Sequence, residues 1–394
     1  MLQSLTNRLR RVTTTGRFVP EIDGLRFVAI MTVVAFHVLT YLRAQHPMFS
    51  APHTESFIER AASTGYFGVE LFFVISGFIL ALPFASHHLS GTSPVKLGRY
   101  LKRRLTRLEP PYIVSLLVLS AAWLFVRHAP LSWVATHLPA HIFYVHSFLL
   151  GTETGLSTVT WSLEIEIQFY LLVPLLTKAF AIQDTRLRRG LFVAAMMAVG
   201  VFSESQHLDA LIRSGPPHLF HYLQFFLVGM LLADVYVADW KSKPTLWPLA
   251  DLFGVAAFAG IFVLVLTRTY EYLLTAPLMF VAYAAVFRGP MLRRIFSFPI
   301  FTAIGGMCYT VYLYHNSIIW VAARATGALQ IGNSLSLTFL ANFIVLAVVT
   351  VAVSIPLYLA VERPFMNTEW MSRWFNRKSA NTLPAAAGKP SIEG

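Results

Sequence analysis

Residues 24–43 read GLRFVAIMTVVAFHVLTYLR, an apolar run in which only Arg26, His37 and Arg43 can carry a positive charge. An apolar helix of about 20 residues spans the ~30 Å hydrocarbon core of a bilayer. The run therefore predicts a membrane-spanning helix. The whole chain agrees, because 56% of its 394 residues are hydrophobic and only 13% are charged, against about 25% charged in soluble domains. A soluble fold is excluded.

The remaining hydropathy pattern predicts an all-α membrane protein with about ten transmembrane helices. Most of its apolar runs reach the roughly 17–25 residues that a crossing requires. The apolar stretch 139–150 stays open as an interfacial segment, a re-entrant segment or an additional span. The ten expected spans cover residues 24–43, 66–86, 110–127, 161–180, 190–204, 218–236, 249–267, 270–287, 299–323 and 335–360.

The distribution of Lys and Arg predicts the orientation of these spans. Ten spans with the N-terminus inside place 25 of the 31 basic residues on the cytoplasmic side, as the positive-inside rule requires. We therefore expect both termini in the cytoplasm. We divide the chain into a cytoplasmic segment (1–22), a transmembrane domain (23–366) and a tail (367–394), which Trp370 and Trp374 would anchor at the membrane surface. The net charge is +12, and the basic residues lie between the apolar runs. We therefore expect membrane lipid and no nucleic acid as a partner.

Two ionisable residues share the interior of the first span. The eleven residues from Arg26 to His37 bring both side chains to within about 20° of one helix face, about 16 Å apart along the axis. A polar group inside a membrane is costly and needs a partner or a function. A neutral imidazole at the depth of His37 suits general-base chemistry. The alternatives are a helix-packing hydrogen bond for His37 and a flanking charge for Arg26.

Polar residues recur at helical spacing in other spans. Ser162, Glu166 and Tyr170 form one stripe on the fourth span, which should face the interior of the bundle. A structural ion pair with an arginine is the alternative role for this carboxylate. The other polar residues inside the expected spans are Glu70 and Ser76 in the second, and Tyr309, Tyr312, His315 and Asn316 in the ninth.

Few residues suggest a metal site. Cys308 is the single cysteine, so an internal disulfide and a cysteine-based cluster are excluded. His218 and His221 have a spacing that could bind a metal, but no carboxylate lies nearby, and we interpret them as a membrane-interface cluster. We expect no metal.

A run of basic residues, Lys102-Arg103-Arg104-Leu105-Thr106-Arg107, precedes the third span. As charge alone it is an ordinary cytoplasmic loop. As the start of a helix it would direct several guanidinium groups at one place, which suits a phosphorylated cytosolic ligand.

Taken together, these motifs resemble the acyltransferase-3 family of integral-membrane O-acyltransferases. The resemblance covers nearly the whole chain, because its six blocks occur in order between residues 23 and 365. Cys308 and Asn316 depart from residues common in the family, and Glu164 is an added acid. The blocks are Asp23-Gly24-Leu25-Arg26 with His37, Phe72-Phe73-x-x-Ser76-Gly77, Arg103-Arg104-x-x-Arg107, Trp161-Ser162-Leu163 with Glu166-x-Gln168-Phe169-Tyr170, Tyr309-x-x-Tyr312-Leu313-x-His315, and Glu362-Arg363-Pro364-Phe365.

The resemblance implies a multi-pass protein of the bacterial inner (plasma) membrane that transfers an acyl group, usually acetyl, to a hydroxyl. The donor is cytosolic acyl-CoA, a co-substrate rather than a permanently bound cofactor. The acceptor is a sugar, an exopolysaccharide, a lipopolysaccharide or another glycan. Some members carry a further extracytoplasmic domain, so we expect this membrane domain to act alone or with a separate extracytoplasmic partner.

The resemblance also suggests roles for individual residues. His37 would be the general base or a transient acyl carrier, and Glu166 would orient its imidazole. The CoA phosphates would bind Arg26, Arg103, Arg104 and Arg107. Weaker candidates for binding the acceptor or stabilising an oxyanion are Tyr170, Tyr312, His315, Ser76 and Glu70.

A secondary transporter or flippase is the alternative function. Buried Glu, His and Arg side chains in ten spans are equally natural there. Transporters built from repeats should contain two similar halves, and the motifs of the first and fourth spans have no copy later in the chain. This favours the enzyme.

Overall fold

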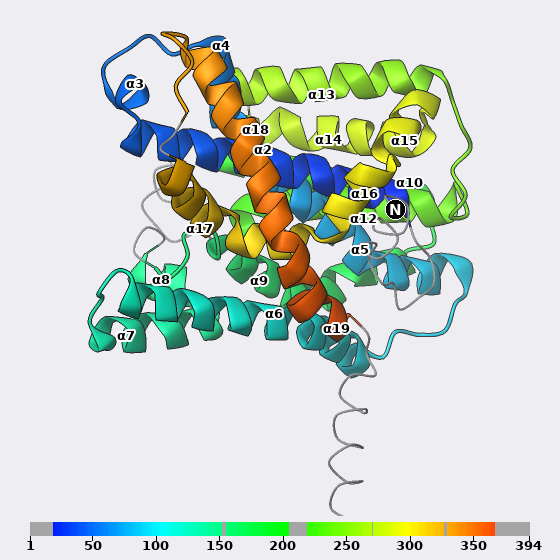
Figure 1. The fold of residues 1–394 in the computed structure, drawn as a ribbon. Helices are drawn as coiled ribbons and strands as arrows, with labels where there is room; N and C mark the ends of the chain where they lie inside the picture. The colour runs from blue at the N-terminus through cyan, green and yellow to red at the C-terminus, as the bar shows by residue number, and fades with distance from the viewer. Residues whose placement is uncertain (1–18, 152–154, 205–218, 270, 327–328, 367–394) are drawn as a thin grey trace, which may run out of the picture.

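The computed structural model describes residues 19–151, 155–204, 219–269, 271–326 and 329–366, and all regular elements in them are helices (Figure 1). The predicted N-terminal segment up to residue 18, His218 and the tail with its aromatic anchor lie outside the described residues. The longer helices are α2 (Pro20–Gln45), α5 (Gly68–Ser90), α6 (Leu97–Phe125), α7 (Leu131–Ile142), α9 (Trp161–Leu176), α10 (Thr185–Glu204), α12 (Leu219–Ala238), α13 (Leu249–Thr267), α14 (Glu271–Arg288), α17 (Cys308–Thr326) and α18 (Leu335–Leu357). The shorter ones are α3 (Pro47–Ser50), α4 (Phe57–Ser63), η1 (Thr64–Phe67), α8 (His146–Leu150), η2 (Thr177–Ala181), α15 (Pro290–Phe296), α16 (Pro299–Gly306), η3 (Tyr358–Glu362) and α19 (Arg363–Phe365).

The decisive stretch of sequence forms α2, which lies in the middle of the bundle (Figure 1). Pro20 stands in its first turn, where a missing N–H costs nothing, and Glu21 and Asp23 complement the positive end of the helix dipole. Helices α5, α16, α17 and α18 pack against α2. This position brings Arg26 and His37 into the interior of the bundle.

Small residues let the central helices approach closely. A Cβ atom on Gly77 of α5 would lie 2.2 Å from the carbonyl oxygen of Phe226 on α12, and one on Gly229 would lie 2.2 Å from that of Val74. Only glycine permits such backbone contact, as the Ser76-Gly77 pair predicts. Gly305 of α16 meets the backbone of α2 in the same way.

Seven described segments are long and apolar enough to cross a membrane: Pro20–Gln45, Phe57–Ser90, Leu97–Phe125, Leu219–Ala238, Leu249–Thr267, Glu271–Arg288 and Leu335–Phe365. The seven agree with seven of the ten expected spans. Each of the other three expected spans is a short helix, a divided helix or a helix with charged residues at its start. The predicted span 161–180 consists of α9, which has 16 residues, followed by η2. The predicted span 190–204 lies in α10, whose first residues are rich in arginine. The predicted span 299–323 is divided at Met307 into α16 and α17.

The last of these segments, 299–323, nevertheless runs along α2 between the two ends of the bundle. We call the end that holds Arg26 and Arg188 the basic end, and the end that holds Tyr41 and Trp320 the far end. The ring of Phe301 in α16 stacks on Phe27 near the start of α2, and Trp320 of α17 contacts Tyr41 near its end. That the segments 161–180, 190–204 and 299–323 cross a bilayer stays a prediction.

The stretch 139–150, left open by the sequence, forms the end of α7 and the short helix α8. Helix α7 has 12 residues and packs against α6. Neither helix reaches the ~17 residues of a crossing, so this stretch is not an additional span within the described residues.

Candidate functional site

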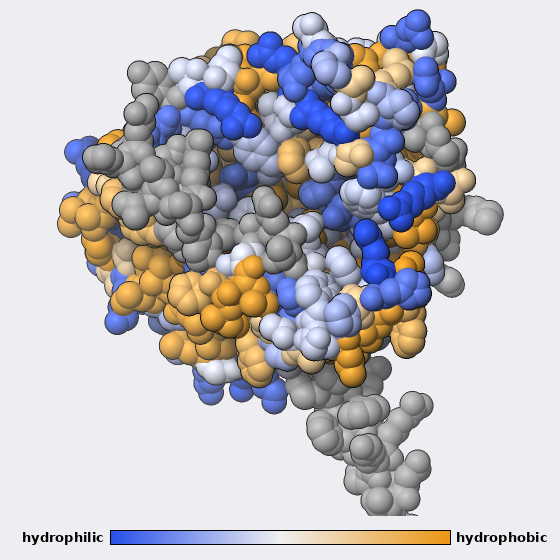
Figure 2. Space-filling view, turned by 90° about the vertical axis from the view of Figure 1, so that its left-hand side faces the viewer, coloured by the Kyte–Doolittle hydropathy of each residue, from blue (hydrophilic) through white to orange (hydrophobic). Residues whose placement is uncertain are grey.

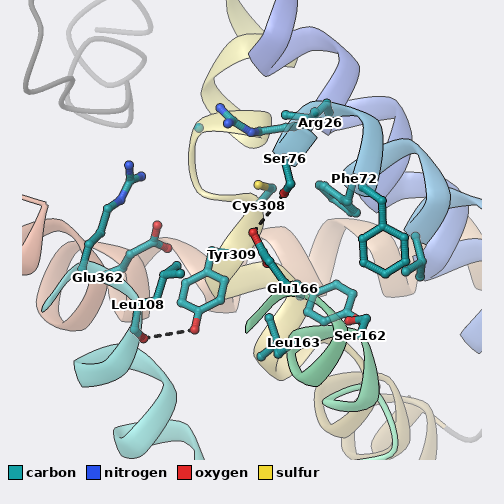
Figure 3. Close-up of a pocket in the computed structure, with 16 residues that line it drawn as sticks. Arg26, Phe72, Ser76, Leu108, Ser162, Leu163, Glu166, Cys308, Tyr309 and Glu362 are labelled. Carbon is teal, nitrogen blue, oxygen red and sulfur yellow. Dashed lines mark hydrogen bonds between the residues drawn. The ribbon is translucent and has the colours of Figure 1, made fainter. Parts of the chain in front are cut away.

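A cavity of about 120 Å³ lies between α2, α5, α6, α9, α17 and η3 (Figure 3). Its apolar walls include Phe72, Leu108 and Leu163. Apolar residues thus enclose a small group of convergent polar ones, the usual composition of a ligand site. Its polar lining is Arg26, Ser76, Arg107, Ser162, Glu166, Cys308, Tyr309, Tyr312 and Glu362.

Two arginines from different helices reach this cavity. Arg26 is 8% exposed, and its guanidinium group forms an ion pair with Asp23, one turn earlier on α2. The pair holds Arg26 in one orientation and offsets part of the cost of burying its charge. Arg107 reaches the same cavity from α6. The carboxylate of Glu362 accepts hydrogen bonds from Thr310, 3.0 Å from its N and 2.6 Å from its Oγ1. The two cations and the acid thus meet from three elements far apart in sequence.

Glu166 lies at the centre of a hydrogen-bonded group. Its Oε1 atom accepts hydrogen bonds from the hydroxyls of Ser76 at 2.9 Å and Tyr170 at 2.7 Å. Its Oε2 atom has no hydrogen-bond partner within the described part of the chain. The polar stripe predicted from sequence therefore faces the interior: Ser162 and Glu166 line the cavity, and Tyr170 donates to Glu166. The arginine pair considered as its alternative role is absent among the described ion pairs.

Tyr312 closes the cavity toward the far end. Its hydroxyl donates to the carbonyl oxygen of Val159 at 2.7 Å, because a carbonyl can only accept. The hydroxyl of Ser162 lies 2.6 Å from the tyrosine oxygen and 3.3 Å from the same carbonyl oxygen, to which it can also donate. The hydroxyl proton of Tyr312 thus takes part in a hydrogen bond within the protein.

His37 lies beyond this tyrosine. The ring of His315 lies 5.7 Å from that of Tyr312 and 4.7 Å from that of His37. Nδ1 of His37 is 2.9 Å from the carbonyl oxygen of Val33 and 3.3 Å from Nε2 of His315. No hydrogen bond joins His37 to Glu166 within the described residues. The imidazole that Glu166 was expected to orient is instead held by a second histidine.

Most of the predicted site residues fall into two places. Ser76, Tyr312, Arg26, Arg107 and Glu166 line the cavity, and Tyr170 joins it through the carboxylate. His37 and His315 form a pair beyond Tyr312.

The two remaining arginines of the basic run lie off the cavity wall. Arg104 lies over the ring of Tyr100, 5.8 Å from its centre, and its Nη2 is 3.5 Å from the carbonyl oxygen of Ile79. Arg103 is exposed. Only Arg107 of this run reaches the cavity.

Glu70 is not brought into the cavity. It is 5% exposed, and its Oε2 atom has no hydrogen-bond partner within the described residues. Nearby, the hydroxyl of Tyr66 donates to Glu271 at 2.6 Å. Glu70 thus belongs to a separate acidic group between α5 and α14.

Four functional candidates were not among the site residues predicted from sequence. Asp23 and Glu362 stood inside recognised motif blocks, and that membership was the available signal. Tyr309 lies one turn before Tyr312 on α17, and its hydroxyl donates to the carbonyl oxygen of Leu108 at 3.1 Å. Cys308, which in the sequence served only to exclude a disulfide and a cysteine-based cluster, lines the cavity.

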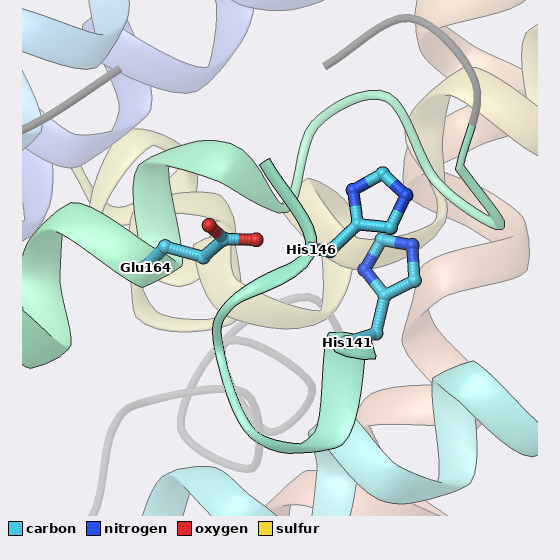
Figure 4. A group of neighbouring side chains, drawn as sticks. All are labelled: His141, His146 and Glu164. Atoms are coloured by element: carbon cyan, nitrogen blue, oxygen red, sulfur yellow. The ribbon is translucent and has the colours of Figure 1, made fainter. Parts of the chain in front are cut away.

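A group of possible metal ligands lies outside the cavity (Figure 4). One ligand atom each from His141, His146 and Glu164 lie within 4.8 Å of one another. Burial and the neighbouring imidazoles lower the pKa of His141 to about 3, and burial and His137 lower the pKa of His146 to about 4. Both rings are therefore neutral near pH 7, the protonation state that a metal ligand needs.

The geometry of this group does not fit a metal. Nε2 of His141 accepts a hydrogen bond from the backbone N–H of Leu156 at 3.1 Å. Its Nδ1 lies 3.1 Å from the hydroxyl of Thr160. The two imidazoles are stacked, 3.9 Å apart and 7° from parallel, so one ion cannot lie in both ring planes at about 2.0–2.1 Å from each nitrogen. The group instead supports the chain leading into α9.

A family model described as an acyltransferase domain (Acyl_transf_3) matches residues 19–359. A putative O-acetyltransferase of Staphylococcus aureus strain COL is 24% identical over 329 residues, covering 77% of this chain and 51% of the relative. The O-acetyltransferase OatA of S. aureus strain NCTC 8325 is 24% identical over 330 residues, with the same coverage. The chain thus spans about half the length of these relatives. No solved structure matches it.

Proposed function

Because this chain belongs to the acyltransferase-3 family, we propose that it is a membrane O-acetyltransferase. It would move an acetyl group from cytosolic acetyl-CoA to a hydroxyl of a sugar, polysaccharide or glycolipid. The observation that carries the proposal is the cavity itself: two arginines meet there at the basic end, and the His37–His315 pair lies just beyond it. The names of the O-acetyltransferase relatives support the same reaction.

The donor would enter from the basic end. Arg26 and Arg107 line the cavity, and Arg104 lies on the same helix one turn before Arg107. Guanidinium groups bind phosphate oxygens through charge-assisted, often bidentate hydrogen bonds. These residues would hold the phosphates of CoA and direct its thioester into the apolar part of the cavity. Arg103, being exposed, would contribute long-range attraction rather than a direct contact.

The acceptor would enter from the far end. Figure 2 shows the face at the ends of α2 and α17, where hydrophilic side chains gather around a hollow. A sugar has many hydroxyls and suits such a surface better than an apolar one. His37 lies between this face and the cavity. Donor and acceptor would then meet near Tyr312, whose ring separates the cavity from the histidine pair.

The chemistry would follow from the free nitrogen of His37. The acceptor hydroxyl gives its proton to the imidazole while its oxygen forms a bond to the thioester carbonyl carbon. The carbon–sulfur bond then breaks, and the CoA sulfur leaves as a thiolate that takes up a proton. Formation of an acyl-imidazole that the acceptor then attacks is the second route. Glu166 would act on the donor side, where its free Oε2 atom can accept a hydrogen bond.

A label-transfer assay tests the proposal. Membranes containing the protein and native glycans are incubated with acetyl-CoA labelled in the acetyl group, and label in the glycan is measured per amount of inserted protein. We expect incorporation with the wild type and a loss of about 10²–10⁴-fold with His37→Gln, which keeps size and polarity but is not a base. His128→Gln, at an exposed position, is the matched control. Glycan movement across the membrane without label incorporation would instead support the transporter.

A further inference from the structure

The tautomer of His37 follows from its neighbours. Nδ1 lies 2.9 Å from the carbonyl oxygen of Val33, and a carbonyl can only accept, so Nδ1 carries the hydrogen. In the neutral ring the other nitrogen, Nε2, then holds the lone pair. That nitrogen is the base that the proposed function needs.

His315 has a fixed tautomer for the same reason. Its Nδ1 lies 2.7 Å from the carbonyl oxygen of Tyr312 and must donate to it. Its Nε2 therefore offers a lone pair, and this atom lies 3.3 Å from Nδ1 of His37. The side chain is fully buried, so no solvent can take its place as an acceptor. The N–H of His37 thus faces two acceptors, one on its own helix and one on α17.

The two acceptors are not equivalent. The carbonyl oxygen of Val33 also belongs to the hydrogen-bond ladder of α2, where it is the i−4 acceptor for the backbone N–H of His37. Nε2 of His315 has no other hydrogen-bond partner within the described residues. When His37 takes up a proton, its Nδ1–H becomes a charge-assisted donor. The hydrogen bond from this N–H to Nε2 of His315 then becomes stronger.

We propose that His315 is a positioning residue, which holds His37 in the Nδ1–H tautomer and stabilises the imidazolium formed when the acceptor hydroxyl is deprotonated. The inference rests on the proposed function. It assigns His315 no contact with either substrate. The atoms that react are the Nε2 of His37, the acceptor hydroxyl and the thioester, and His315 acts on them through the Nδ1–H alone.

The test uses two substitutions of matched size in the full-length protein. His315→Gln can place an amide oxygen near the former Nε2 position, whereas His315→Met fills similar space with only a weak acceptor. We expect His315→Met to lower kcat by about 10- to 100-fold, with the KM for acetyl-CoA unchanged. His315→Gln should restore most of the loss. Equal rates for the two variants, or a rate of His315→Met equal to that of the wild type, would overturn the inference.

A measurement independent of turnover accompanies the kinetics. The protein is labelled with ¹⁵N-histidine, and the signals of His37 are identified by their absence from the spectrum of His37→Gln. We expect a protonated Nδ1 and an unprotonated Nε2 in the wild type, with a weaker preference in His315→Met. A wild type with a protonated Nε2 contradicts the inference. A wild type that transfers no acetyl group overturns the proposed function, whereas an active wild type with an active His315→Met overturns only the role of His315.

Discussion

Arg103 and Arg107 differ in exposure although they are one helical turn apart on α6. Arg107 lines the cavity, whereas Arg103 is exposed. The sequence presents both as members of one basic run, and it contains no signal that separates a ligand contact from a topogenic charge. The two residues lie on nearly the same face of α6, so the distinction arises along the helix axis: η3 and α17 pack against α6 and cover Arg107 but leave Arg103, one turn earlier, exposed.

This difference predicts separate kinetic effects. Arg107→Gln should raise the KM for acetyl-CoA by about tenfold or more, because a charge-assisted phosphate contact is lost, and should change kcat less. Arg107→Lys should recover part of the loss, since an ammonium keeps the charge but not the guanidinium fork. Arg103→Gln is the matched comparison and should change KM less. Steady-state kinetics against donor concentration measure all three, and an equal change in KM for Arg103→Gln and Arg107→Gln would contradict the assignment.

How far the site can be predicted from sequence depends on sequence separation. Helical arithmetic places Arg26 and His37 on one face of α2, and Glu166 and Tyr170 on one face of α9, because both pairs are local. The partner of His37 is 278 residues away, and the partner of Glu166 on α5 is 90 residues away. Periodicity within one helix contains no information on which helix lies opposite. The roles of these residues stay predictions, and the structure places His315, not Glu166, beside His37.

Among the elements, α5 and α12 are in close backbone contact in the core. The Cβ of an alanine at Gly77 would overlap the carbonyl oxygen of Phe226, which belongs to a backbone that cannot move independently. We expect Gly77→Ala to destabilise the protein by about 1–3 kcal/mol, the usual cost of overpacking. Thermal unfolding in detergent, with and without donor, measures the change.

A glycine in an open helical position supplies the control. Gly98 lies in the first turn of α6, and a Cβ there meets nothing within 4 Å. Gly98→Ala should therefore be neutral or stabilise the protein by up to about 1 kcal/mol, because alanine is the better helix former. Equal unfolding temperatures for the two alanine variants would show that the α5–α12 contact tolerates an added methyl group.

Hydropathy alone does not predict where a helix is broken or shortened. A continuous span was expected over 299–323, but the chain turns at Met307 between α16 and α17. Next to the break, Gly305 approaches the backbone of α2 at Asp23 so closely that a Cβ atom would not fit. Cys308, Tyr309 and Tyr312 reach the cavity from the helix that follows the break. A hydropathy window averages over such a turn and cannot detect it.

For the whole molecule, the decisive question is whether α9 and α10 cross the membrane. Arg188 and Arg189, at the start of α10, form ion pairs with Asp234 near the end of α12. Helix α12 runs parallel to α5, since Phe67 contacts Phe225 and Phe78 contacts Tyr236. Gln183, just before α10, therefore lies at the basic end. Together α9 and η2 cover Trp161–Ala181, about 30 Å of helical rise, which is enough for one crossing.

The topology predicts which positions a reagent outside the cell can reach. With the single cysteine replaced in Cys308→Ser, new cysteines are introduced one at a time at exposed positions: Ala51, Ser93, His128 and Gln183. A membrane-impermeant maleimide on intact cells should label Ala51→Cys and His128→Cys at the far end. It should not label Ser93→Cys and Gln183→Cys, which become reactive only after the membrane is opened. If only the seven long apolar segments crossed, Gln183 would lie on the same side as His128 and would be labelled in intact cells. Protection of Gln183→Cys therefore requires α9 to cross, and it would place the arginines of α10 on the cytoplasmic side, as the positive-inside rule demands.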